Sequence, residues 1–494
     1  MSIIKNNWRN AIKIILFSIL VISMLWGILS IFNYKDMGGG GGFQRFYQAD
    51  KNSIDVLFFG SSHAHCTIDH GLLWDQYGMA GYTLSAGSQE LDSTYYFVRE
   101  TLEKQTPKVV VVEVLGATGE EIHNDETVVY RNTLGMEWSG NFTEYMTYLK
   151  ENMKMEDTWA KEVFAKIPII HSRYTELTQA DFYDNISFMR GYRGSFDVVP
   201  FERPTAADNT EFMELNSERQ QMLQNIIDTA KEHNVSIVLI ASPFILEDSH
   251  QMYFNAVEEL AKENQIPFIN YNKLYDEINI DFQRDFRDVS HVNNYGAKKV
   301  TTHLAEFLKQ NYDIPDRRGQ KGYELWDENA LYLRNKWYRH ELENAENINS
   351  YLQKLTESED EQITMIALTG NYNALGEVYF EKLSELGITR EQYETGGAFV
   401  LKENALTDYL PGKEYNKCFK TKNGEIHLES SICQTEDGEI RDDVKMLING
   451  QNYRMVENGV NIVVYNEMIN QLIDAAGDDV YLGLELVHNE KPEE

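Results

Sequence analysis

The chain has 494 residues, of which 42% are hydrophobic and 25% charged. This composition is typical of a globular protein, and the length predicts two or three domains rather than one core. The formal net charge is −33, from 78 acidic and 45 basic residues. Such a charge would repel a phosphate backbone, so we expect no nucleic-acid partner.

The first apolar segment is residues 14–32, IILFSILVISMLWGILSIF, which contains no charge. At 1.5 Å per residue its 19 residues span roughly 28 Å, the thickness of a bilayer core. The residues before it, 1–13, carry three basic side chains and no acid, which by the positive-inside rule keeps them cytoplasmic. A cleavable signal peptide is the alternative, but the following NYKDMGGGGGF offers no clear cleavage site. We therefore expect a single-pass anchor in the cell membrane, with the main domains extracellular.

Residues 33–45 contain five consecutive glycines and are expected to form a flexible linker. Strands and helices then alternate through residues 46–312, with residues 116–210 as a large insertion. The predicted strands are 54–59, 82–87, 108–114, 236–243 and 267–271, and the predicted helices are 91–104, 211–234, 251–264 and 293–311. This alternation predicts the α/β class, a three-layer α/β/α sandwich around a parallel sheet.

A Gly-Ser-Ser turn ends the first predicted strand, in the stretch IDVLFFGSSHAHCTID. Side chains there face the crevice at the carboxyl ends of the strands, where open α/β sheets bind ligands. A serine becomes a nucleophile when a base takes its proton and an acid orients that base. Asp288 and His291 stand three residues apart just before the last helix, in DFRDVSHVNNYGA. Alone the turn needs no catalytic explanation, but with this second motif we interpret Ser62 as a nucleophile and Ser61 as a turn residue.

These two blocks resemble the SGNH/GDSL hydrolase superfamily over roughly residues 50 to 312. The resemblance implies that Ser62 is the nucleophile, His291 the general base and Asp288 the orienting acid. It also implies that the backbone N–H groups of Ser62 and Gly87 stabilise the oxyanion. No metal and no organic cofactor is implied.

The third block departs from the family, which has an asparagine in a GxND motif after the third strand. Here the sequence is VVVVEVLGATGE, with Glu113 and no asparagine. Either Gln89 supplies the missing oxyanion donor or the oxyanion hole is weaker. We name His63, Glu113 and Arg131 as weaker candidates for substrate binding, and interpret His65 as a structural or rim residue.

The membrane anchor and the GSS turn are similar to those of the membrane-anchored, extracytoplasmic SGNH branch. That branch includes the D-alanyl-lipoteichoic acid transfer and alginate-type O-acetyltransfer proteins. It implies a serine esterase or O-acyltransferase that acts on acyl groups of a cell-surface glycan, alongside a multispanning membrane acyltransferase. A plain cell-surface esterase and a non-catalytic glycan-binding or assembly protein are the alternatives.

Residues 313–345 are charged and contain proline and glycine, so we expect a second linker there. Residues 346–494 are expected to form a smaller α+β accessory domain without a catalytic or metal-binding motif. Two of its stretches, 363–387 and 459–481, are similar to the interleukin-like EMT inducer domain, some members of which bind carbohydrate. The resemblance implies a carbohydrate-binding role, and a purely stabilising accessory domain is the alternative. Its two cysteines, Cys418 and Cys433, either pair or stay free.

Overall fold

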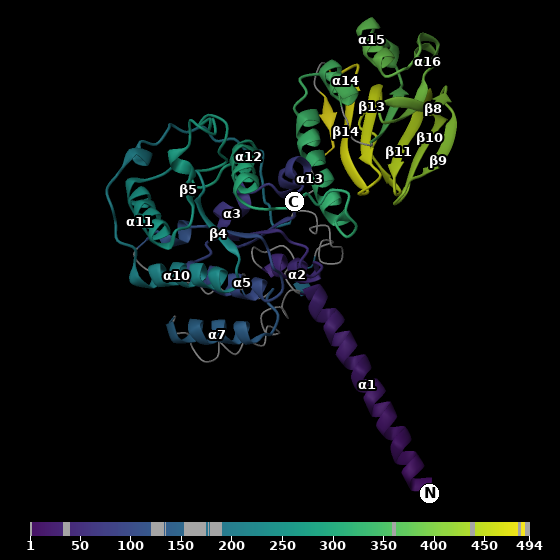
Figure 1. Ribbon diagram of the computed structural model, residues 1–494. Coiled ribbons are helices and arrows are strands. Elements are labelled where there is room, and N and C mark those ends of the chain that lie inside the picture. The colour runs from purple at the N-terminus through teal and green to yellow at the C-terminus, as the bar shows by residue number, and fades with distance from the viewer. Residues whose placement is uncertain are drawn as a thin grey trace. The chain divides into compact units, whose positions relative to one another are not determined.

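The computed structural model describes residues 2–32, 40–119, 133, 135–152, 174–175, 177, 190–357, 362–434, 440–482 and 486–489. The chain divides into two compact units, Met1–Ala330 and Leu331–Glu494. Each unit has its own hydrophobic cores, so each is described separately. Figure 1 shows the mixed helices and strands of the first and the strand-rich second.

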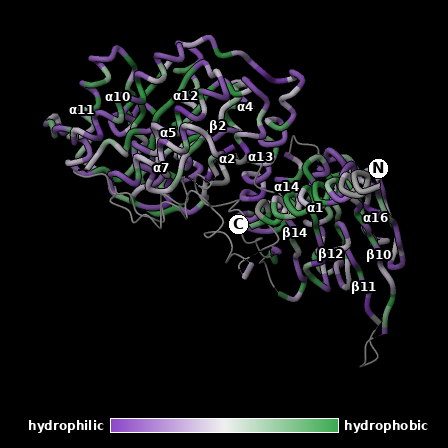
Figure 2. The backbone as a smooth tube through the Cα atoms, turned by 90° about the horizontal axis from the view of Figure 1, so that it is seen from below, coloured by the Kyte–Doolittle hydropathy of each residue, from purple (hydrophilic) through white to green (hydrophobic). Residues whose placement is uncertain are grey.

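Helix α1 (Ser2–Phe32) contains the predicted anchor. Its segment Asn10–Ile28 is long and apolar enough to cross a membrane, and the hydrophobic colouring of α1 is visible in Figure 2. Large apolar side chains along it are exposed, as the lipid-facing side chains of an anchor would be. A signal sequence near the N-terminus has the same properties, so the uncleaved anchor and its orientation remain predictions.

Part of the expected glycine-rich linker is instead a helix of the first unit. Helix α2 (Gly40–Gln48) begins within the glycine run, and its Phe43 and Phe46 are fully buried. The ring of Phe43 packs edge-on against Phe97, with centroids 4.6 Å apart. Burial of these aromatic side chains offsets the cost of placing glycines in a helix. The linker boundary at residue 45 was therefore wrong.

A five-stranded parallel sheet forms the centre of the first unit, in the order β2-β1-β3-β4-β5. Side chains alternate between its faces, so Leu57 and Phe59 enter one core cluster while Val56 and Phe58 enter another. Both clusters are apolar, which explains why these strands are nearly continuous hydrophobic runs. The strands are β1 (Val56–Gly60), β2 (Gly81–Ser85), β3 (Val109–Glu113), β4 (Ser236–Ala241) and β5 (Phe268–Asn270).

Helices cover both faces of this sheet, as Figure 1 shows. Apolar side chains of α5 (Leu91–Leu102), α10 (Ser217–Glu232) and α11 (Asp248–Asn264) join one core cluster. Those of α4 (His70–Tyr77) and α12 (Asn294–Asn311) join the other. The predicted three-layer α/β/α sandwich is thereby confirmed. Of the predicted insertion, the structure describes mainly α7 (Gly140–Asn152) and residues 190–210.

The second expected linker, residues 313–345, also belongs to folded structure. Arg317 forms a bidentate ion pair with the buried Asp55, with Nε–Oδ2 and Nη2–Oδ1 distances of 3.0 and 2.9 Å. Tyr323 stacks on Trp74 in the core of the first unit, and the ring of Trp326 lies tilted against Trp74 with centroids 6.2 Å apart. Helix α13 (Glu324–Glu343) follows, and the boundary between the units falls inside it. The linker prediction was wrong because aromatic anchors and an ion pair hold this polar segment.

The second unit contains two antiparallel sheets. One has the order β15-β14-β13-β6-β7-β8 and the other β12-β11-β10-β9, with an apolar cluster formed from side chains of both. Helices α14 (Ile348–Glu357), α15 (Glu377–Glu385) and α16 (Arg390–Thr395) contribute to a cluster on the six-stranded sheet. The strands are β6 (Ile363–Thr369), β7 (Gly397–Lys402), β8 (Ala405–Pro411), β9 (Tyr415–Lys420), β10 (Glu425–Gln434), β11 (Ile440–Ile448), β12 (Gln451–Asn452), β13 (Gly459–Asn466), β14 (Gln471–Asp479) and β15 (Val487–His488).

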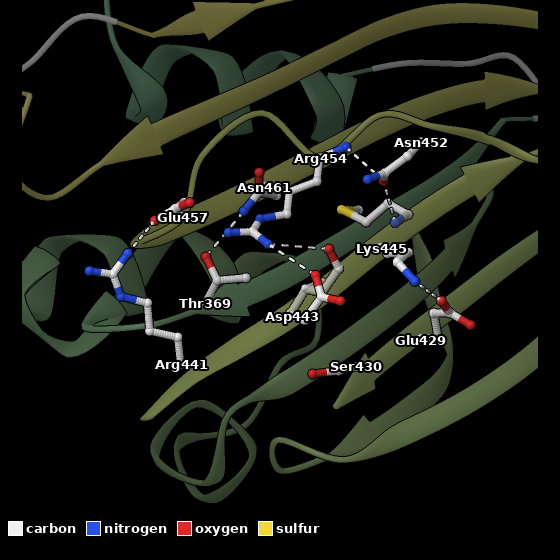
Figure 3. Close-up of polar contacts among 12 residues, drawn as sticks. Thr369, Glu429, Ser430, Arg441, Asp443, Lys445, Asn452, Arg454, Glu457 and Asn461 are labelled. Atoms are coloured by element: carbon white, nitrogen blue, oxygen red, sulfur yellow. Dashed lines mark hydrogen bonds and ion pairs between the residues drawn. The ribbon is translucent and has the colours of Figure 1, made fainter. Parts of the chain in front are cut away.

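Polar side chains reinforce this second unit, as the close-up in Figure 3 shows. The buried Asn461 donates to Thr369 Oγ1 at 3.2 Å and accepts from the backbone N–H groups of Met455 and Val456 at 2.8 Å. It thereby fastens the segment before β13 to the six-stranded sheet. Lys445 and Glu429, opposite each other on β11 and β10, form an ion pair at 2.7 Å.

The three cysteines are free. Cys418 lies opposite His427 of β10, whereas Cys433 is six residues farther along that strand. At about 3.3 Å per residue this separation is on the order of 20 Å, far beyond the reach of a disulfide. The open alternative of a Cys418–Cys433 pair is therefore resolved in favour of free thiols.

Candidate active site

The Gly-Ser-Ser turn joins β1 to a short helix, α3 (Ser62–Thr67). Ser61 caps this helix, because its Oγ accepts a hydrogen bond from the backbone N–H of His63 at 3.3 Å. Gly60 has φ +147°, and a Cβ there would lie 2.7 Å from Glu113 Cβ. Glycine is thus required for the chain to pass this close to β3. Ser62 follows as the first residue of α3, half-buried at the end of β1.

The DxxH motif brings its two side chains to the same turn. His291 Nε2 lies 2.7 Å from Ser62 Oγ, and His291 Nδ1 lies 2.9 and 3.0 Å from the two carboxylate oxygens of Asp288. The loop is closed by a hydrogen bond from Arg287 N to His291 O at 3.1 Å. Asn293 then caps α12 by accepting from the backbone N–H of Tyr295 at 3.0 Å. The structure therefore places Ser62, His291 and Asp288 in one hydrogen-bonded series.

Asp288 is held in its charged form. Burial works to raise the pKa of this carboxyl, but hydrogen bonds from the His291 ring, the Ser290 N–H and Arg287 outweigh burial and lower it. A carboxylate facing Nδ1 favours the tautomer with its proton on that nitrogen. Nε2 is then free to accept the proton of the Ser62 hydroxyl, which is the arrangement that general-base activation requires.

The two predicted oxyanion donors beyond Ser62 differ in their surroundings. Gly87 follows β2, and a Cβ added there would meet nothing within 4 Å, so the position borders open space. Gln89 is 3% exposed, and its side-chain N–H₂ donates to Thr94 Oγ1 at 2.9 Å. Its Oε1 is buried and has no hydrogen-bond partner among the residues that the structure describes. The roles of both residues in an oxyanion hole remain predictions.

Glu113 packs against the Gly-Ser-Ser turn. It is 2% exposed, and its carboxylate accepts from Ser61 Oγ at 3.2 Å and from Leu115 N at 3.0 Å. Contact with a bound substrate needs an accessible side chain, so this position fits support of the turn better than the predicted substrate binding. The other weak candidate, Arg131, lies outside the described residues.

His63 borders the site with a neutral ring. Its ring centroid lies 5.3 Å from that of His291 and 5.1 Å from that of Phe244. Burial, and then the neighbouring His291 and His250, lower the pKa of His63 to about 3. His65 is held by Ser85 Oγ, 2.9 Å from its Nδ1, and burial lowers its pKa as well. Over the part of the chain that the structure describes, no cluster of His, Cys, Asp or Glu could hold a metal ion.

Sequence reasoning missed two contributors to the site. Arg287 Nε lies 3.3 Å from Asp288 Oδ2, and its place beside the DxxH motif was a signal that could have been used. Phe244 comes from the loop after β4, where its backbone N–H donates to Asn272 Oδ1 at 3.1 Å. No pattern in the sequence marks Phe244, because its position depends on contacts between distant loops.

Comparisons with known proteins add loose structural likenesses. No protein-family model and no curated protein match the chain. A candidate acylhydrolase from Bacteroides fragilis is 14% identical, with a TM-score of 0.28, over 54% of this chain and 93% of its own. The acetyl xylan esterase AlAXEase is 14% identical, with a TM-score of 0.28, over 52% of this chain and 100% of its own. A candidate GDSL-like lipase from Parabacteroides merdae is 14% identical, with a TM-score of 0.25, over 52% and 96%. With TM-scores this low, the case for function rests on the geometry of the site.

Proposed function

We propose that the protein is a serine esterase or O-acyltransferase whose nucleophile is Ser62. The observation that carries this proposal is the hydrogen-bonded series from Ser62 through His291 to Asp288, which joins side chains 229 residues apart in the chain. A serine that only forms a turn does not require this arrangement, in which His291 Nε2 lies 2.7 Å from Ser62 Oγ and the other ring nitrogen faces a carboxylate. Nucleophile, base and orienting acid in this order form the arrangement that acyl transfer uses.

The reaction follows from this geometry. Ser62 Oγ attacks the acyl carbon while His291 Nε2 takes the hydroxyl proton, and Asp288 stabilises the imidazolium. The backbone N–H groups of Ser62 and Gly87 meet the charge on the tetrahedral oxygen. His291 then returns the proton to the leaving alcohol, which leaves the acyl group on Ser62. Water or a sugar hydroxyl, deprotonated by His291, attacks this ester and frees the serine.

The substrate class rests on sequence resemblance and on the apolar helix α1. We place the protein at the cell membrane with both units outside the cytoplasm, where it would act on acyl groups of a cell-surface glycan. A multispanning acyltransferase is the proposed partner, and the second unit is proposed to bind glycan. A non-catalytic role on the same scaffold is the alternative, favoured by the absence of the third-block asparagine and by the hydrogen bond of Gln89 to Thr94.

Labelling with a serine-reactive fluorophosphonate separates these two functions. The full chain in detergent micelles should be labelled, and Ser62→Ala and His291→Ala should abolish labelling. Ser236→Ala, which changes an exposed serine at the start of β4, is the matched control and should label like the wild type. A well-folded wild type that stays unlabelled, both alone and with membranes containing its partner, would favour the non-catalytic alternative.

A further inference from the structure

Glu113 is a charged group in a place that disfavours charge. It ends β3, and its carboxyl is enclosed between the turn after β1 and the 3₁₀ turn Leu115–Ala117. Burial raises the pKa of Glu113 to about 7, although hydrogen bonds from Leu115 and Ser61 act to lower it. A buried carboxylate is costly unless its oxygens are hydrogen-bonded. Here Oε2 accepts from Ser61 Oγ and Oε1 from Leu115 N, and the backbone N–H groups of Ser61 and Ser242 also lower the pKa of the carboxyl.

The contacts of Glu113 lead to the nucleophile in two steps. Ser61 Oγ donates a hydrogen bond to Glu113 Oε2 at 3.2 Å, and its lone pairs remain available to accept from the backbone N–H of His63. Ser61 O accepts from Ala64 N at 3.0 Å and completes the first turn of α3. Because Ser62 is the first residue of that turn, the orientation of the Ser61 cap determines where Ser62 Oγ meets His291.

We propose that Glu113 is a positioning residue for the nucleophile: its carboxylate fixes the Ser61 hydroxyl, and Ser61 fixes the turn that presents Ser62. This inference rests on the proposed function and extends it to a residue that touches neither the substrate nor the reacting atoms. Glu113 supports the turn from behind instead of facing the substrate.

Changes at Glu113 and Ser61 should have non-additive effects on the labelling rate of Ser62. Glu113→Gln keeps the size of the side chain but turns one acceptor oxygen into a donor, so it opposes a donor at Ser61 or Leu115. Ser61→Ala removes the hydroxyl through which Glu113 acts. Each change should slow fluorophosphonate labelling of Ser62 by about tenfold, because small misplacements of a nucleophile cost rate. The double variant should be slowed by less than the product of the two single effects, since both changes break the hydrogen bond between Ser61 Oγ and Glu113.

The test measures the maximal labelling rate and the half-saturating probe concentration of the full chain in detergent. Loss of position should lower the maximal rate and leave the half-saturating concentration unchanged, because neither residue contacts the probe. Ser61→Thr, which retains a hydroxyl, should restore most of the rate. The matched control is Glu100→Gln: Glu100 is also buried and accepts from Tyr47 OH at 2.9 Å, and its change should leave labelling at the wild-type rate.

The outcomes are distinguishable. Two results would overturn the inference and leave the proposed function intact. One is that Glu113→Gln is labelled as fast as a wild type that labels. The other is that the double variant is slowed by the product of the two single effects. A wild type that never labels would overturn the proposed function, and the inference with it. If Glu113→Gln fails to fold, Ser61→Ala and Ser61→Thr carry the test, and equal rates for the two would overturn the inference.

Discussion

The ring of His63 lies edge-on against the ring of His291, with centroids 5.3 Å apart and planes inclined by 65°. Because burial lowers the pKa of His63 to about 3, it presents a neutral ring to the proposed base rather than a competing charge. Of these two imidazoles, it is His291 that has a carboxylate facing its second nitrogen, which suits it to the proposed role of base.

This contact predicts the effect of a charge at position 63. His63→Phe keeps an aromatic ring against His291 and should leave the labelling rate within about threefold of the wild type. His63→Glu would bury a carboxyl group where the structure has a neutral ring, so it should slow labelling by about tenfold or more. Equal labelling rates for the wild type and His63→Glu would contradict this assignment.

Asp288 should matter through the tautomer of His291. Asp288→Asn keeps the shape of the side chain but removes the charge that holds the Nδ1 proton, so the labelling rate should fall by about 10³-fold or more. Asp316→Asn is the control: Asp316 is half-exposed and pairs with Arg318, so its change should leave the rate unaltered. The measurement is fluorophosphonate labelling at neutral pH. An Asp288→Asn rate within tenfold of the wild type would exclude the orienting role.

The burial of Glu113 predicts a dependence of stability on pH. A carboxyl whose pKa is raised on folding, here to about 7, binds its proton more tightly in the folded chain. Its contribution to stability is therefore fully present below about pH 4.5 and is lost as pH rises through 7, by roughly 3 kcal/mol. Urea unfolding of the first unit at pH 5 and pH 8 should show this loss in the wild type and a smaller one in Glu113→Gln. Equal losses in both proteins would contradict it.

Much of the first unit could be predicted because its signals are local. The valine run at 109–112 indicates a strand buried on both faces, and the DxxH spacing brings Asp288 and His291 to one turn of a short loop. The position of Glu113 could not be predicted in the same way. Glu113 is buried because Gly60 of the neighbouring strand lets the two strands approach closely. The sequence alone does not show whether the Glu113 side chain points toward the crevice or into the protein.

The errors have a common physical origin in contacts between distant residues. The glycines before Phe43 indicate a linker when only the local sequence is considered. The segment is helical because Phe43 of α2 packs against Phe97 of α5, far along the chain. Strand β14 has the largely small and polar sequence QLIDAAGDD, and it is a strand through its pairing with β13. Composition predicts such segments as irregular, whereas the backbone hydrogen bonds of a neighbouring strand determine their structure.

The segment after α12 provides the last prediction, which tests whether it is a part of the first unit. Arg317→Ala would leave Asp55 buried without its bidentate partner, which should lower the free energy of unfolding of the first unit by about 3 kcal/mol. Arg318→Ala is the matched control one residue away, since it breaks an ion pair between partly exposed side chains that is worth at most about 1 kcal/mol. Urea unfolding, followed by the fluorescence of the buried Trp74 and Trp326, measures both. If residues 313–323 were a free linker, both variants would unfold at the same urea concentration as the wild type. Equal unfolding midpoints for Arg317→Ala and Arg318→Ala would therefore contradict the prediction.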